Sequence, residues 1–194
     1  MDESRRRGRQ LLLIIAAVFL LPVVIAFAMY YGGLWRPSGT SNKGELIQPA
    51  RPLMFAGLKH FDGNPAGADL FTGKWTLIYI GDGACDPDCK QALVFGRQSR
   101  FALNNEMTRV QRVFLATGNC CAKDYIAAEQ PGLIALDASA PDARSLLAQF
   151  PADPRHSLYI VDPLGNLMMR YDASQTSKAL LTDLKKLLKL SHIG

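Results

Sequence analysis

The chain has 194 residues and a formal net charge of +5, and four arginines among its first nine residues supply much of that charge. No basic stripe interleaved with aromatic residues follows, so the composition argues against a nucleic-acid-binding protein. What lies beyond the N-terminal segment is long enough for one domain with its own core, and we find no internal repeat.

An N-terminal membrane anchor is the first predicted element. Residues 1–10 form a basic segment, and Leu11–Tyr31 is 21 residues long without a charge. This stretch can cross a hydrocarbon core of about 30 Å as a single transmembrane helix. The positive-inside rule places residues 1–10 in the cytoplasm and the remainder outside. No Ser-rich, acid-poor transit segment precedes it, which favours a bacterial inner membrane with a periplasmic domain.

A cleaved signal peptide is the alternative, because Ala26-Phe27-Ala28 is an acceptable cleavage site. The apolar run is longer than the 7–15 residues usual in signal peptides, which favours an uncleaved anchor. In either case the domain lies in an oxidising compartment, where the four cysteines can form disulfides.

Residues 32–52 are predicted to be a flexible tether, because glycine and proline occur among Ser, Thr and Asn without an apolar period. Residues 53–194 are predicted to form one domain. At its start, residues 53–61 and 68–71 are expected to form a hairpin around the turn at residues 62–65.

The rest of this domain alternates strands and helices. Trp75–Ile80 is apolar on both faces, as expected of a central strand. Further strands are expected at 110–116, 133–136, 157–161 and 167–171, and helices at 87–105, 122–129, 141–150 and 176–190. This order, β-α-β-α-β-β-α after an N-terminal hairpin, predicts an α/β thioredoxin-like fold, with helices flanking a central mixed sheet.

Two cysteines stand where the central strand leads into the first long helix, in Cys85-Asp86-Pro87-Asp88-Cys89. The positive end of the helix dipole favours their thiolates, whereas Asp86 and Asp88 oppose them. Thiolates carry out redox chemistry and bind soft metals. A disulfide across so short a loop restricts the unfolded chain little, so stability alone is a poor reason for one.

His156 is the histidine with the strongest case for a role, since it directly precedes the strand 157–161. In thioredoxin-like folds this junction lies beside the cysteine loop, and thioredoxins have a cis-proline there. Two thiolates from Cys85 and Cys89 with one imidazole suit copper, and zinc would also bind. His60 and His192 fall in a hairpin and a tail, where no role is predicted.

A second cysteine pair, Cys120-Cys121, follows the strand 110–116. Adjacent cysteines rarely bond to each other, and this strand end is expected at the same sheet edge as Cys85. Two interpretations stay open: further redox thiols or soft ligands, or two small buried residues at a strand–helix turn.

The chain resembles the Sco/SenC family of copper-binding assembly factors. The resemblance rests on Asp69–Trp75, Gly81, the Cys85-x3-Cys89 motif and the segment Arg155–Gly165. It implies that Cys85, Cys89 and His156 bind one copper per chain, as Cu(I) or Cu(II). It also implies a role in maturing the CuA site of cytochrome c oxidase subunit II, by donating copper or by reducing its cysteines. The partners would be subunit II and other assembly factors, and the domain would be monomeric.

The chain departs from the family pattern, which makes it a divergent member. Asp86 and Lys90 follow the two cysteines where proline is usual, and Arg155 replaces a residue that is often acidic. The segment Thr117–Cys121 stands where an acidic, proline-containing stretch is typical.

Other functions are weighed against this metallochaperone or assembly role. A membrane-anchored thiol–disulfide oxidoreductase would use Cys85 and Cys89 as its redox thiols, but the wide spacing and His156 in place of the cis-proline count against it. Residues 82–84 lack the threonine of a T-x-x-C peroxidase motif. A scaffold that only contacts membrane partners would not need three ligand-type residues at these positions.

Overall fold

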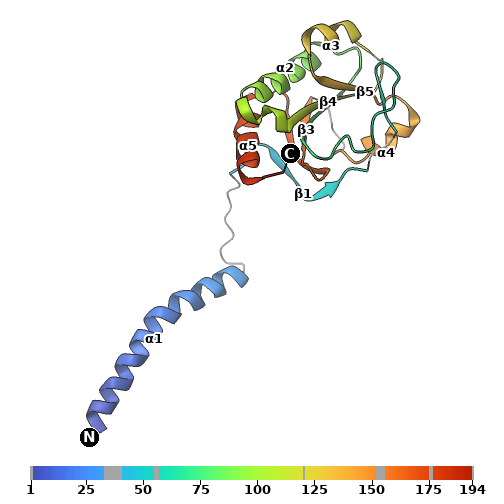
Figure 1. Cartoon of the computed structure of the whole chain (residues 1–194). Coiled ribbons are helices and arrows are strands. Elements are labelled where there is room, and N and C mark those ends of the chain that lie inside the picture. The colour runs from blue at the N-terminus through green and yellow to red at the C-terminus, as the bar shows by residue number, and fades with distance from the viewer. Residues whose placement is uncertain are drawn as a thin grey trace. The chain divides into compact units, whose positions relative to one another are not determined.

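The computed structural model describes residues 2–32, 41–54, 57–119, 121–151, 156–174 and 177–193. The chain divides into two compact units, Met1–Ser41 and Asn42–Gly194 (Figure 1).

The first unit consists of the helix α1 (Asp2–Tyr31). Its segment Arg5–Tyr31 is the one helix in the described part of the chain that is long and apolar enough to cross a membrane. Its apolar side chains are exposed, as expected of a helix that faces lipid rather than protein. The helix bends along its length (Figure 1), and Pro22 within it cannot donate the usual backbone hydrogen bond.

The second unit is built on a seven-stranded mixed sheet in the order β1-β7-β6-β3-β4-β5-β2. The strands are β1 (Glu45–Pro52), β2 (Lys59–His60), β3 (Trp75–Gly81), β4 (Val110–Ala116), β5 (Leu133–Asp137), β6 (Ser157–Val161) and β7 (Asn166–Asp172). β3, β4 and β5 run parallel to each other, and the other pairings are antiparallel. β3 is the central strand and is buried from Trp75 to Ile80, as predicted.

Helices cover both faces of this sheet, which confirms the thioredoxin-like fold. They are α2 (Pro87–Phe101), η1 (Asn104–Arg109), α3 (Lys123–Glu129), η2 (Pro141–Ala143), α4 (Arg144–Leu147) and α5 (Ser177–Leu190). Successive residues of a strand point to opposite faces. Leu77 packs in the cluster with Leu93 of α2 and Leu184 of α5, whereas Ile78 packs in the cluster with Leu146 of α4.

Two predictions for the start of the domain were wrong. Residues 45–52, assigned to the tether, form β1, an edge strand that pairs antiparallel with β7. Edge strands tolerate proline, so Pro49 and Pro52 do not prevent this pairing. The chain does turn at residues 62–65, where Lys59 forms an antiparallel bridge with Pro65, but residues 53–61 do not pair with 68–71. β2 pairs with β5 instead, and residues 67–72 turn back through bonds such as Thr72 N to Asp69 O at 2.9 Å. Residues 33–40 lie outside the described residues.

Two predicted helices are also shorter than expected. The helix 87–105 ends at Phe101, and Asn104 begins η1 with a left-handed φ of 52°. The helix 141–150 is formed only by η2 and α4, through Leu147.

A buried carboxylate fixes the point where the chain enters the domain. Asp183 of α5 is 2% exposed and accepts hydrogen bonds from the backbone N–H groups of Lys43 (2.6 Å) and Gly44 (3.0 Å) and from Tyr171 Oη (2.8 Å). A Cβ at Gly44 would overlap the Tyr171 ring, so the close approach requires glycine. Burial, followed by the bond to Asp183, raises the pKa of Tyr171.

Candidate functional site

The cysteine pair sits at the start of α2, directly after the central strand. Cys85 closes the loop that follows β3, and Cys89 lies in the first turn of the helix. Asp86 caps this helix by accepting a hydrogen bond from Cys89 N at 2.8 Å, and Pro87 occupies a position that needs no donor. Cys85 has a φ of 49°, a left-handed conformation that is costly for a residue with a side chain.

Cys85 and Cys89 are joined in a disulfide, with 5.1 Å between their Cα atoms. Each residue is 2% exposed. In this oxidised form neither sulfur is a thiolate, so neither can act as a nucleophile or as a thiolate ligand. Reduction of the disulfide by two electrons would be needed to convert both sulfurs to thiols.

The loop that carries Cys85 is bonded to the segment that follows β4. Gly83 N donates to Gly118 O at 2.7 Å, and Ala122 N donates to Gly83 O at 2.7 Å. Asp82 reinforces this contact, since its carboxylate accepts from Ala84 N at 2.8 Å and from Asn119 Nδ2 at 2.9 Å. The segment around the second cysteine pair therefore lies at the same sheet edge, as predicted. Cys121 is itself disulfide-bonded, and Cys120 lies outside the described residues.

His156 lies beside this site although it is 67 positions after Cys89. It precedes β6 with a φ of 51°, and its Nε2 is 3.5 Å from Asp88 Oδ2. Its Nδ1 is buried and has no hydrogen-bond partner among the described residues. His156 and Cys89 line the same pocket of about 280 Å³, together with Tyr79, Ile80, Gly81, Asp82, Asp86 and Thr117.

The pocket has a negative electrostatic environment. Burial raises the pKa of Tyr79 to about 12, and the charges of Asp86 and Asp88 add to the shift. The two carboxylates therefore act on groups inside the pocket, and they disfavour any further negative charge there, including that of a thiolate.

No three His, Cys, Asp or Glu side chains in the described part of the chain are arranged to hold a metal ion. The physical reason is local: the two sulfurs are bonded to each other, and the His156 Nε2 edge faces Asp88. His60 lies in β2, and neither it nor His192 lines the pocket.

The sequence reasoning missed three members of this site. Tyr79 was taken only as part of an apolar strand, Thr117 only as part of a turn, and Asp88 only as an opposing charge. The available signal was Tyr79 itself, a hydroxyl-bearing residue two positions before the glycine that begins the cysteine loop.

Family models match most of the chain. A model described as a transmembrane-like, thioredoxin-like C-terminal domain matches residues 75–191. A second model, described as a transmembrane-like N-terminal domain, matches residues 2–33. The chain belongs to this transmembrane-like, thioredoxin-like family. No curated protein sequence matches it.

Among solved structures, this family member is similar to Sco proteins. Apo Sco1 from Thermus thermophilus matches with a TM-score of 0.61 and 18% identity, over 77% of this chain and 99% of that chain. Yeast Sco1 with copper bound matches with a TM-score of 0.60 and 17% identity, over 78% and 95%. BsSco, a Sco-family cytochrome c oxidase assembly protein with a disulfide switch, matches with a TM-score of 0.57 and 16% identity, over 73% and 96%. The thioredoxin-like fold that the resemblance to Sco/SenC proteins implies is confirmed by these matches.

Proposed function

We propose that this protein is a membrane-anchored copper and thiol-redox accessory factor for the assembly of cytochrome c oxidase. The observation that carries the proposal is the Cys85–Cys89 disulfide with the His156 imidazole in the same pocket as Cys89. Its fold, shared with copper-bound yeast Sco1 and with the assembly protein BsSco, supports the same conclusion. The client would be the CuA site of oxidase subunit II, approached together with other assembly factors.

In this proposal α1 remains attached as a single-pass anchor in a bacterial inner membrane. Arg5, Arg6, Arg7 and Arg9 hold the N-terminus in the cytoplasm, and the domain faces the periplasm. A fixed anchor raises the effective concentration of membrane-bound clients without any new contact.

Copper is the cargo, and it binds after a dithiol reductant has given two electrons and two protons to the disulfide and has itself become a disulfide. When copper binds, the two thiols lose their protons to solvent. Cys85 and Cys89 then supply two thiolates one helical turn apart, and His156 supplies a nitrogen. The buried Nδ1 of His156 suits this role, because it has no hydrogen-bond partner among the described residues. The same dithiol can instead reduce a client disulfide: its two thiols become the Cys85–Cys89 disulfide while the client gains two thiols.

The first prediction is that the reduced chain binds one copper through these three residues, whereas the oxidised chain does not. Cu(I) titration of the detergent-solubilised chain, with a chromogenic competitor, measures this. Cys85→Ala, Cys89→Ala and His156→Ala should each weaken binding at least ten-fold, because each removes one of three ligands. His60→Ala and His192→Ala are matched controls and should bind as the parent does. Parent-like affinity in all three ligand variants would mean that the site is misassigned.

A metal-free thiol–disulfide oxidoreductase is the second candidate. It is favoured by one observation, that His156 Nε2 lies 3.5 Å from Asp88 Oδ2. The variant His156→Ala distinguishes the two functions. If the protein is a copper-binding factor, the variant should lose copper binding. If it is a metal-free oxidoreductase, the variant should keep dithiol–disulfide exchange with a client peptide.

A further inference from the structure

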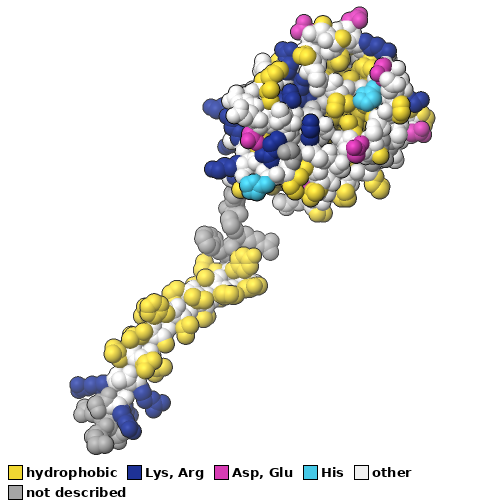
Figure 2. Space-filling view, viewed as in Figure 1, with side chains coloured by type: hydrophobic (Ala, Val, Ile, Leu, Met, Phe, Trp, Pro, Cys, Tyr) yellow, Lys and Arg dark blue, Asp and Glu magenta, His cyan; other side chains and the backbone are white. Residues whose placement is uncertain are grey.

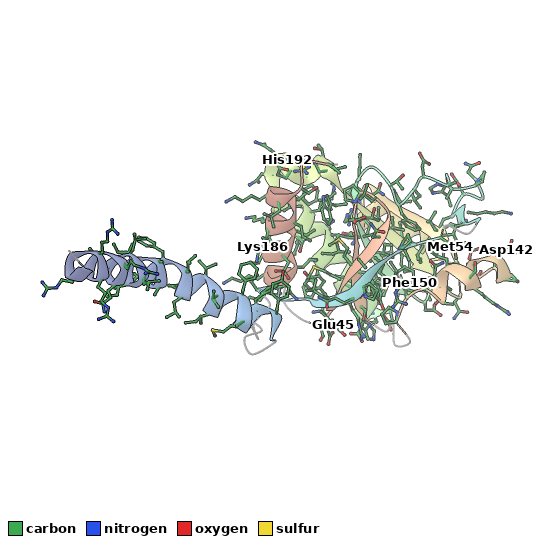
Figure 3. The ribbon with its side chains drawn as sticks, turned by 90° about the horizontal axis from the view of Figure 1, so that it is seen from below. Glu45, Met54, Asp142, Phe150, Lys186 and His192 are labelled. Atoms are coloured by element: carbon green, nitrogen blue, oxygen red, sulfur yellow. A yellow bond between two sulfur atoms is a disulfide. The ribbon has the colours of Figure 1, made fainter. Side chains whose placement is uncertain are left out.

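α5 presents a positively charged face to solvent. Four exposed lysines lie on this helix, and we call them the lysine face: Lys178, Lys185, Lys186 and Lys189. The only acidic residue of α5 is Asp183, which is buried and already accepts three hydrogen bonds. Lys and Arg side chains gather over the part of the domain where α5 lies (Figure 2), and Lys186 lies on the outer side of this helix (Figure 3).

Apolar side chains adjoin the lysine face at the C-terminal end of α5. Leu190 is 74% exposed and Ile193 is 53% exposed. Arg109 holds this end in place by donating hydrogen bonds to the carbonyl oxygens of Leu188 (3.1 Å), Ser191 (2.7 Å) and Ile193 (2.9 Å). Exposed aliphatic residues beside lysines are the combination that favours a membrane interface.

A hollow of about 220 Å³ lies within the same surface, between α5 and η1. Its lining consists of Lys185, Lys189, Leu103, Leu188 and Glu106. The Glu106 carboxylate is 2.6 Å from Arg109 Nη1, so its charge is compensated by that guanidinium. The hollow is thus lined by two lysines, two leucines and a carboxylate whose charge is compensated.

The entry point of the chain lies at this helix. The backbone N–H groups of Lys43 and Gly44 bond to Asp183 of α5. Only 11 residues, Gly32 to Asn42, separate α1 from this attachment. They can span at most about 40 Å. If α1 is the membrane anchor proposed above, α5 is held within that distance of the bilayer surface. The inference below rests on that anchoring and not on the chemistry of the cysteine pair.

We infer that the lysine face binds the anionic headgroups of the bilayer that holds α1. Each lysine close to an anionic surface strengthens the attraction about five-fold, and salt weakens it. The contact also orients the site. Lys185 and Lys189 adjoin Leu103, just past the C-terminal end of α2, whereas Cys89 lies in its first turn. The helix is about 22 Å long, so the cysteine pair would face away from the lipid, toward a client that rises above it.

The test uses the full chain in lipid nanodiscs, made of phosphatidylcholine alone or with phosphatidylglycerol. Amine acetylation followed by mass spectrometry gives the modification rate of each lysine. The lysine face should react several-fold more slowly in the anionic discs than in the neutral ones, and high salt should abolish the difference. Lys59 and Lys123, exposed elsewhere on the domain, serve as internal controls and should react equally in both discs.

A variant that lacks three of the four lysines tests whether the protection of Lys178 depends on the charge of the lysine face. In Lys185→Gln/Lys186→Gln/Lys189→Gln, the protection of Lys178 should disappear, whereas the matched variant Lys59→Gln/Lys74→Gln/Lys123→Gln should retain it. Thermal unfolding checks that both variants are folded.

Equal rates in the two kinds of disc would overturn the inference. So would protection that appears only when membrane proteins are added, which would indicate an acidic protein partner. A failed anchor is recognised separately, because the chain would not co-purify with the discs. A failed copper site would leave the protection unchanged, as would Cys85→Ser/Cys89→Ser.

Discussion

Two residues of the site adopt a backbone conformation that is unfavourable for their type. Cys85 and His156 both have left-handed φ values, 49° and 51°, and neither is glycine. Such conformations persist only where the surroundings impose them. At Cys85 the imposing contacts are the bonds of the loop to the segment after β4, and at His156 they include the bond from Ala173 N to its carbonyl oxygen. Both unfavourable conformations therefore occur in residues of the site, one in the cysteine loop and one beside the pocket that Cys89 lines.

Asp88 adds a negative charge beside both His156 Nε2 and the cysteine pair, so under the proposed function Asp88→Asn should strengthen Cu(I) binding. The variant removes the ion pair and one charge that opposes the thiolates. The gain should be only two- to five-fold, because the side chains of His156 and Asp88 are 43% and 65% exposed. Competitive Cu(I) titration measures it. Asp124→Asn, in the first turn of α3, is the matched control. Weaker binding in Asp88→Asn would show that Asp88 positions the imidazole for the metal instead.

Tyr79 should make the domain sensitive to alkali. Its pKa of about 12 in the folded domain lies above the value near 10 expected when unfolded. The stability from its neutral form is therefore complete below pH 10 and is lost between pH 10 and pH 12. The loss is on the order of 2 kcal/mol. Tyr79→Phe should lose less free energy of unfolding over this range, measured by urea titration at each pH. Identical losses in the variant and the parent would contradict the assignment.

Sequence could identify the site's sulfur and imidazole residues but not their contacts. The Cys85-x3-Cys89 spacing and the position of His156 before a strand are local features. Together with the expected thioredoxin-like fold, they predict that the three residues lie near one another. The ion pair of His156 with Asp88 joins residues 68 positions apart. It depends on how β6 packs against β3, which no local pattern specifies.

Among the strands, those with a clear pattern in their own sequence were predicted, whereas those defined by a distant partner were not. β3 and β4 were predicted closely because both are largely buried and mostly apolar, although β4 also contains Gln111 and Arg112. β1 was missed because it carries little apolar pattern of its own and is defined by its partner β7. The predicted hairpin failed for the related reason that β2 pairs with β5 and, through a bridge from Lys59 to Pro65, with residues just after the turn, but not with residues 68–71.

Asp183 should be the main polar attachment of β1 to α5. Asp183→Ala leaves the N–H groups of Lys43 and Gly44 and the hydroxyl of Tyr171 without their acceptor. The free energy of unfolding should fall by roughly 3 kcal/mol, since each unsatisfied buried donor costs about 1–3 kcal/mol. Asp183→Asn keeps one acceptor oxygen and should cost less. Urea unfolding measures both, and hydrogen exchange should show the loss first in β1. Equal stability of Asp183→Ala and the parent would mean that water replaces the carboxylate.

For the whole molecule, the structure shortens the connection between anchor and domain. The sequence suggested a tether of 21 residues, from Gly32 to Pro52, but β1 and the Asp183 bonds incorporate its second half into the domain. The remaining 11 residues reach at most about 40 Å. Under the proposed function, a client would therefore have to present its metal site closer to the bilayer than a tether of 21 residues would require.

That requirement holds only if α1 stays attached, which is the last prediction. The mature protein should retain its N-terminus and remain in the membrane fraction after carbonate extraction, because an apolar helix of this length is stable in lipid. N-terminal sequencing is the direct measurement. Replacing residues 1–31 with a cleavable signal peptide should leave Cu(I) affinity unchanged, since the ligands lie in the second unit. It should nevertheless lower oxidase activity in the host membrane, because the domain then diffuses away from its client. A mature chain that begins at Met29 would show that the apolar helix is a cleaved signal and that the domain acts in free solution.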